Sequence, residues 1–218
     1  ERSALMSDWQ VTQIPHVTDT NRYQPLDRET SRAKLGLPTD IPLVLFLSSA
    51  GIADSRKGFD LLEQALPIVQ ASHQHVQVVV VGPKPTNYRP QSNVPLIWTG
   101  PITDDDVLIR LYNASNVLAV PSRDDNLPLS AIEAQSCGTP VVGFNVGGIP
   151  DIVDHNSSGF IADAGDFHNL AEGLVRAIED SLGEASWSLR AREHAVETWS
   201  PRSVASQYLQ VYERTYAG

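Results

Sequence analysis

The chain has 218 residues, of which 41% are hydrophobic and 19% charged, so it is long enough for one large globular domain or two small ones. Its formal net charge of −10 leaves no basic stripe to follow a phosphodiester backbone, and we expect no nucleic-acid partner. The only cysteine, Cys137, excludes an internal disulfide, and the six histidines have no metal-ligand spacing, so we expect no metal.

The sequence predicts a cytoplasmic location. No apolar run approaches the ~20 residues of a membrane-spanning helix, and the first ten residues lack the charged-then-apolar order of a signal peptide. The chain starts without Met and enters strand-like sequence almost at once, which suggests a piece of a longer protein. For that longer protein, peripheral contact with the inner face of a membrane stays open.

The first half of the chain alternates between predicted strands and helices. A continuous apolar run at 42–49 predicts a strand buried on both faces. Apolar residues at helical spacing from Lys57 onward predict a helix that ends at "SHQH". Buried strands are predicted at 76–82 and 96–100, and Thr103 is predicted to cap the next helix.

The second half continues this alternation and then becomes helical. Strands are predicted at 117–122, 140–145 and 159–162, with helices between them, and the chain is purely helical after residue 165. The alternation predicts an α/β fold: a Rossmann-like, doubly wound parallel sheet of about six strands with C-terminal helices. In such sheets, ligands bind beyond the carboxyl ends of the strands.

The segment "DDNLPLSAIEAQSCGTPVV" combines a possible anion site with two carboxylates. Asn126 is the predicted helix cap, and Pro128 lies in the first turn, where its missing N–H costs nothing. The unpaired amides that follow point towards the ligand edge and favour a bound anion. They belong to Leu127, Leu129 and Ser130.

Glu133 interrupts the apolar line that it shares with Leu129 and Cys137 on one helix face. A carboxylate there is partly desolvated, which is costly unless it meets donors such as ligand hydroxyls. The local sequence equally allows a structural interpretation, in which Asp125 is a capping residue and Glu133 a solvated helix acid.

A second candidate anion site is "SSAGIADSRKGFDLL". It resembles a phosphate-binding loop, but Arg56 replaces the second glycine and Gly58 follows Lys57 in place of the hydroxyl that binds magnesium. Two adjacent cations before a helix remain, which is enough to hold a diphosphate without a metal. Alternatively, both are surface cations at a helix start.

Several segments, in this order, resemble the carboxy-terminal half of family 4 retaining glycosyltransferases with the GT-B fold: "RKGFDLL", "VVVVG", "WTGPIT", "VPSRDDNLPLSAIEAQSCGTPVVGFNVGGIPDIV" and "SSGFIADAGDFHNLAEGL". "IPHVTDTNRYQP" and the closing "ETWSPRSVASQYLQVYE" extend the resemblance over nearly the whole chain. It implies a linker at 1–25, a nucleotide-sugar-binding domain at 26–198, and a helix at 199–218. That helix would cross towards an amino-terminal acceptor-binding domain, which this chain lacks.

The resemblance also implies roles for individual residues. Two acids with seven residues between them mark the donor site of the family, and Asp125 and Glu133 have this separation. Glu133 would accept the ribose hydroxyls, Asp125 those of the donor sugar, and Lys57 would stabilise the leaving diphosphate; these three are the implied catalytic residues. Further implied contacts with the donor are Arg56 and Gly58, Ile102 and Asp104 beside the base, and Asn126, Leu127 and Leu129 near the phosphates.

The sequence departs from the family pattern in three places. The first acid is usually Glu, whereas Asp125 is one methylene shorter; no Arg stands about six residues before Lys57; and His16 and Val17 replace the usual Asn-Gly. The resemblance implies the donor-binding domain of a metal-independent hexosyltransferase that needs no cofactor and is inactive without its other half. Two alternatives stay open: a non-catalytic nucleotide-sugar sensor and a GT-B nucleotide-sugar epimerase.

Overall fold

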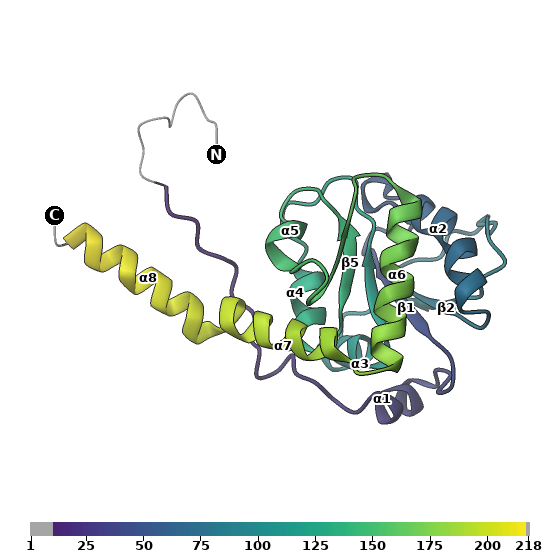
Figure 1. Cartoon of the computed structure of the whole chain (residues 1–218), viewed down its shortest axis with the longest axis horizontal. Helices are drawn as coiled ribbons and strands as arrows, with labels where there is room; N and C mark the ends of the chain where they lie inside the picture. Colours follow the sequence, from purple (N-terminus) through teal and green to yellow (C-terminus); the bar gives the residue numbers. More distant parts are fainter. Residues whose placement is uncertain (1–10, 217–218) are drawn as a thin grey trace.

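A six-stranded parallel sheet forms the centre of the computed structural model, which describes residues 11–216 (Figure 1). The strands lie in the order β3-β2-β1-β4-β5-β6, and each neighbouring pair is parallel. Their bounds are β1 Leu43–Leu47, β2 Gln77–Val81, β3 Leu96–Gly100, β4 Val117–Val120, β5 Val141–Phe144 and β6 Gly159–Ala162. Each strand lies within a predicted range, so the doubly wound α/β fold is confirmed.

Helices connect the strands and continue to the end of the described chain. Their bounds are α1 Arg28–Leu35, the short 3-10 helix η1 Ser55–Lys57, α2 Phe59–Ser72, α3 Asp105–Ala114, α4 Leu129–Ser136, α5 Ile149–Ile152, α6 Phe167–Leu182, α7 Ser186–Trp199 and α8 Pro201–Tyr216. The end of α2 at the predicted "SHQH" stop and the three helices after residue 165 confirm the predicted helical segments.

The residues of each strand alternate between two hydrophobic cores, one on each face of the sheet. In β1, Val44 and Phe46 join a core that includes α2 and α6, whereas Leu43 and Leu45 join a core that includes α3, α4 and α7. Figure 1 shows α6 and α4 on different sides of the strands. The continuous apolar runs follow from this arrangement, because helices cover both faces of the inner strands β1, β2, β4 and β5. The prediction of a buried strand at 96–100 is wrong: β3 lies at the edge of the sheet, and its residues are partly buried or exposed.

Two helices begin later than the sequence predicts. Asp104, not Thr103, caps α3, because the Asp104 carboxylate accepts a hydrogen bond from the amide of Asp106 at 2.8 Å. The first residue of α4 follows directly after Pro128, so Asn126 is not its cap and Pro128 precedes the first turn. The prediction of Thr103 overlooked that Asp104, one residue later, can itself accept a hydrogen bond from an amide of the first turn.

The segment at 11–25 meets the last helices at one corner of the molecule (Figure 1). The amide of Thr18 donates to the carbonyl of Trp199 at 2.9 Å, and Arg192 of α7 donates to the carbonyls of Thr20 and Tyr23. From that corner α8 projects away from the sheet, and only one of its residues is buried, Val204. Its exposed large hydrophobic side chains are Tyr208, Leu209, Tyr212 and Tyr216.

Parts of the predicted linker and of the predicted terminal helix fall outside the structure. Residues 1–10 of the predicted linker and 217–218 of the predicted terminal helix lie outside the described residues. Within 11–216, no helix has the length and hydropathy needed to cross a bilayer.

Candidate functional site

A pocket of about 430 Å³ opens at the carboxyl end of the sheet, on the predicted ligand edge. It is bounded by the ends of β1, β2 and β3, by the loop after β4 and by the first turn of α4. Six of the residues implied in donor binding line it: Lys57, Ile102, Asp125, Leu127, Leu129 and Glu133. Because the strand order reverses between β1 and β4, segments far apart in the sequence converge on one cavity.

Lys57 and Asp125 form an ion pair in this pocket, with Nζ 2.7 Å from Oδ2. Lys57 ends η1, after β1, and Asp125 lies in the loop after β4, so the pair joins two walls of the pocket. The side chain of Asp125 is 13% exposed and that of Lys57 is 32% exposed, so solvent screens their attraction less than it would at an open surface.

Two close backbone contacts set the position of this ion pair. Gly58, at φ +67°, follows Lys57, and a Cβ atom on it would lie 1.8 Å from the carbonyl oxygen of Pro121. On the other side, Gly147 has φ +52°, and a Cβ atom there would lie 1.7 Å from the carbonyl oxygen of Asp125. Only glycine fits at either place, so the two loops that carry the charged side chains are held by direct backbone contact.

Arg123 fastens the loop after β4 to the start of α2. Its amide donates to the carbonyl of Arg56 at 2.7 Å, and its guanidinium donates to both carboxylate oxygens of Asp60, at 2.8 and 2.6 Å. These hydrogen bonds lower the pKa of Asp60. The contact keeps the segments of Lys57 and Asp125 side by side.

Glu133 lies in the α4 wall of the pocket and accepts a hydrogen bond at Oε2 from the hydroxyl of Tyr112, over 2.7 Å. Burial raises the pKa of Glu133, and the bond from Tyr112 opposes that rise. The side chain therefore has the environment predicted for an acid that interrupts an apolar line. The sequence suggested ligand hydroxyls as its hydrogen-bond donors, and the structure adds a donor from the protein, the hydroxyl of Tyr112.

The first turn of α4 supplies backbone donors at the pocket. The amide of Ala131 donates to the carbonyl of Pro128 at 3.0 Å. The amides of Leu129 and Ser130, which both line the pocket, make no hydrogen bond within residues 11–216. Unpaired amides at the positive end of a helix favour a bound anion.

Four of the implied donor contacts do not line the pocket. Arg56 has a side chain that is 72% exposed and pairs with Asp54 at 2.8 Å. Asp104 is occupied as the cap of α3. Gly58 and Asn126 stand next to lining residues without lining the pocket themselves.

Sequence reasoning missed the polar lining residues Ser48, Ser49, Thr103 and Tyr112. The serine pair that ends the predicted strand at 42–49 was an available signal, because the carboxyl end of that strand was already the expected ligand edge. For Tyr112 there was none, since a tyrosine on the apolar face of a helix has the pattern of a core residue. Within 11–216, no group of three or more His, Cys, Asp or Glu side chains is placed to hold a metal ion.

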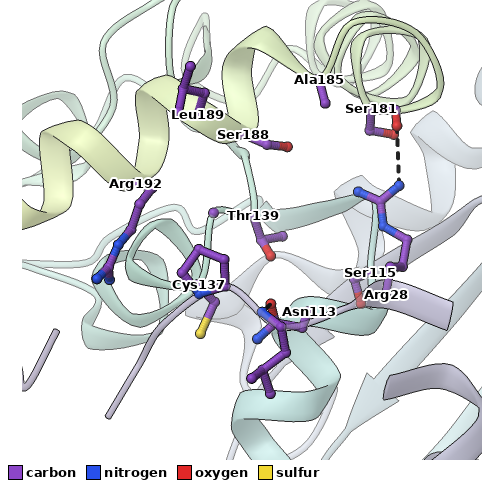
Figure 2. Close-up of a pocket in the computed structure, with 13 residues that line it drawn as sticks. Arg28, Asn113, Ser115, Cys137, Thr139, Ser181, Ala185, Ser188, Leu189 and Arg192 are labelled. Atoms are coloured by element: carbon purple, nitrogen blue, oxygen red, sulfur yellow. Dashed lines mark hydrogen bonds between the residues drawn. The ribbon is translucent and has the colours of Figure 1, made fainter. Parts of the chain in front are cut away.

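A second cavity, of about 400 Å³, lies at the opposite end of the sheet, beside α7 (Figure 2). Most of its polar groups are already bonded within the protein. Arg28 donates to the carbonyl of Ser181 at 3.2 Å, Thr139 to the carbonyl of Tyr112 at 2.8 Å, and Arg192 to three carbonyls. Because a ligand there would find few unpaired groups, we assign this cavity no function.

Comparison with known proteins identifies the family. The model of the family "Glycosyl transferases group 1" matches residues 41–180. The chain belongs to the group 1 glycosyltransferases. Its sequence is 33% identical over 216 residues to the D-inositol 3-phosphate glycosyltransferase of Saccharomonospora viridis. The match covers 91% of this chain and 49% of that protein, so the chain spans about half the length of the relative.

Several solved structures share the fold. Sucrose-phosphate synthase from Thermosynechococcus elongatus superposes with a TM-score of 0.79 at 27% identity, over 98% of this chain and 56% of that one. The carboxy-terminal domain of a group 1 glycosyltransferase, LpcC of Francisella tularensis, gives a TM-score of 0.70 at 17% identity, over 84% of this chain and 99% of that one. This glycosyltransferase chain therefore has the Rossmann-like fold of the carboxy-terminal region of GT-B enzymes.

Proposed function

We propose that the pocket at the carboxyl end of the sheet binds a nucleoside diphosphate sugar. The chain would then be the donor-binding half of a retaining, metal-independent hexosyltransferase of family 4. The observation that carries the proposal is the grouping of one cation, two carboxylates and unpaired helix amides around a single cavity. These are the groups that a diphosphate flanked by two sets of hydroxyls requires.

In this proposal the diphosphate of the donor meets positively charged groups, and the hydroxyls on either side of it meet carboxylates. The diphosphate lies against Lys57 and the amides of Leu129 and Ser130, which stabilise the negative charge that grows on the leaving group. Glu133 accepts hydrogen bonds from the ribose hydroxyls, and Asp125 accepts them from the donor sugar. Ile102 packs beside the base.

The other half of the enzyme would hold the acceptor. Support comes from the length of the chain, about half that of the Saccharomonospora relative, and from α8, which leaves the sheet with an exposed apolar side. The linker at 1–25 and the helix at 199–218 would connect the two halves, and the chain alone would bind donor without turning it over. Fusing the amino-terminal half of the natural protein and measuring sugar transfer to a hydroxyl acceptor separates an enzyme from a nucleotide-sugar sensor.

Calorimetry tests the binding site directly. We expect the chain to bind at least one member of a panel of nucleoside diphosphates and their sugars. We expect Lys57→Ala and Glu133→Ala each to weaken that binding by about ten- to a hundredfold, because each removes a charge-assisted hydrogen bond of about 1.5–3 kcal/mol. The matched control is Lys34→Ala, which removes an exposed lysine of α1 outside the pocket. Unchanged affinity in both pocket variants would overturn the assignment.

A further inference from the structure

Tyr112 has a polar tip at the candidate site although the rest of the residue is core. Its relative exposure is 0%, its ring belongs to the core formed with α4 and β4, and its hydroxyl donates to Oε2 of Glu133. It also lines the pocket. A phenol buried so deeply needs a hydrogen-bond partner, and here the partner is the carboxylate proposed to bind ribose.

The groups around Glu133 shift the pKa values of Glu133 and Tyr112. Burial raises the pKa of Glu133, the hydrogen bond from Tyr112 lowers it, the charge of Asp105 on α3 raises it, and the hydroxyl of Tyr23 in the N-terminal segment lowers it. The pKa of Tyr112 itself lies well above its usual value because of burial and the neighbouring carboxylate, so it remains a donor. At the C-cap of α4, burial raises the pKa of Cys137 to about 12, so that thiol stays neutral.

We propose, resting on the proposed function, that Tyr112 is a positioning residue for nucleotide recognition: its hydroxyl anchors one oxygen of Glu133 and holds the carboxylate in place as an acceptor for a ribose diol. An ionised carboxylate has about four acceptor positions, so one bond from Tyr112 leaves the others available to a ligand. An anchored Glu133 also loses less rotamer freedom when the ligand binds. Tyr112 itself would act only through Glu133.

The test compares Tyr112→Phe with Tyr88→Phe. Both changes remove one hydroxyl that donates to a carboxylate, but Tyr88 serves Glu63, outside the pocket. The first readout is the titration of Glu133 followed by NMR of ¹³C-labelled glutamate carboxyls, with the resonance assigned through Glu133→Gln. The second is the pH dependence of nucleoside diphosphate affinity, expressed at each pH as a ratio to wild type.

Tyr112→Phe should raise the pKa of Glu133, because the carboxylate loses a donor while the opposing burial remains. Binding needs the ionised form, so affinity falls as the pH falls through that pKa, and in the variant it falls at higher pH. We expect the loss of affinity relative to wild type to be larger at pH 5 than at pH 8, by up to about tenfold, since one lost hydrogen bond shifts a pKa by about one unit. Tyr88→Phe should keep the wild-type ratio at both pH values.

Each result decides a separate question. If Tyr112→Phe leaves both the Glu133 titration and the affinity ratio unchanged, the positioning role is wrong while the proposed function stands. If wild-type protein binds no nucleoside diphosphate, the proposed function fails and the inference fails with it. Should the variant not fold, replacing Tyr112 alone by 3-fluorotyrosine keeps the ring and strengthens the donor, and it must then lower the pKa of Glu133.

Discussion

At the scale of single residues, the cation proposed to hold the diphosphate is already occupied. Lys57 donates to Asp125 at 2.7 Å, so a diphosphate must either share Lys57 with that carboxylate or displace the carboxylate. Asp125 would then have two effects on the donor. It would accept hydrogen bonds from the sugar hydroxyls, and it would reduce the positive charge that the diphosphate meets.

Replacing Asp125 by Asn should therefore tighten binding of a nucleoside diphosphate that carries no sugar, by about three- to tenfold, because Lys57 loses its competing partner. Binding of the corresponding nucleotide sugar should gain less, since the amide is a weaker acceptor for the sugar hydroxyls. Calorimetry with both ligands measures the two effects. Asp124→Asn is the control: Asp124 is exposed, and the change in net charge is the same. Equal tightening in both variants would mean that only net charge matters.

The sequence indicated Glu133 because it interrupts an apolar helix face, and Lys57 because it ends a segment like a phosphate-binding loop. Asp125 was indicated by the resemblance to family 4, through its spacing from Glu133. The sequence could not indicate the partner that each side chain chooses. Arg56 turns to Asp54, only two positions away, and Tyr112 meets Glu133 from a different helix. Such pairings follow from tertiary packing and from short local alternatives, neither of which has a periodic pattern in the sequence.

At the scale of elements, the strands were predictable and the loop contacts were not. A strand buried on both faces has a continuous apolar run, whatever its neighbours are. The close approach of the loops after β4 and β5 depends instead on a missing side chain, and "GG" in a sequence indicates a turn as readily as a contact. Gly147 is both: it has φ +52° and lies against the backbone of Asp125.

Gly147→Ala should destabilise the protein by about 2–5 kcal/mol, combining left-handed backbone strain with a clash against the carbonyl of Asp125. Gly165→Ala is the matched control, because Gly165 has φ +79° but nothing within 4 Å of the added Cβ. It should cost about 1–2 kcal/mol from strain alone. Urea unfolding of the two variants measures the difference. Equal losses would mean that the loop after β4 moves aside freely.

At the scale of the whole molecule, the last two helices contribute unequally. α7 buries Ala191, Ala195 and Trp199, whereas α8 buries only Val204. The fold of residues up to α7 therefore depends little on α8. The sequence predicted both helices alike, because helical periodicity does not show which neighbour, if any, a helix packs against.

A chain ending after Ser200 should keep its fold and its nucleotide affinity. The lost burial of Val204 costs about 1.5–3 kcal/mol, which lowers the melting temperature by roughly 3–12 °C in a domain of this size. A chain ending after Gly183 also loses α7 and should show no cooperative unfolding. Differential scanning calorimetry distinguishes these outcomes, and a loss of cooperativity in the longer truncated chain would contradict the prediction.

The hydrogen bond between Thr18 and Trp199 has a practical consequence for protein engineering. The chain enters the folded domain near Thr18 and leaves it near Trp199, so the two connections lie side by side. The domain can therefore be inserted into one surface turn of an unrelated protein through short linkers. Grafted in this way, the sheet and its carboxyl-end pocket would travel together. The proposed nucleotide-sugar site could then be transferred to a protein that has none.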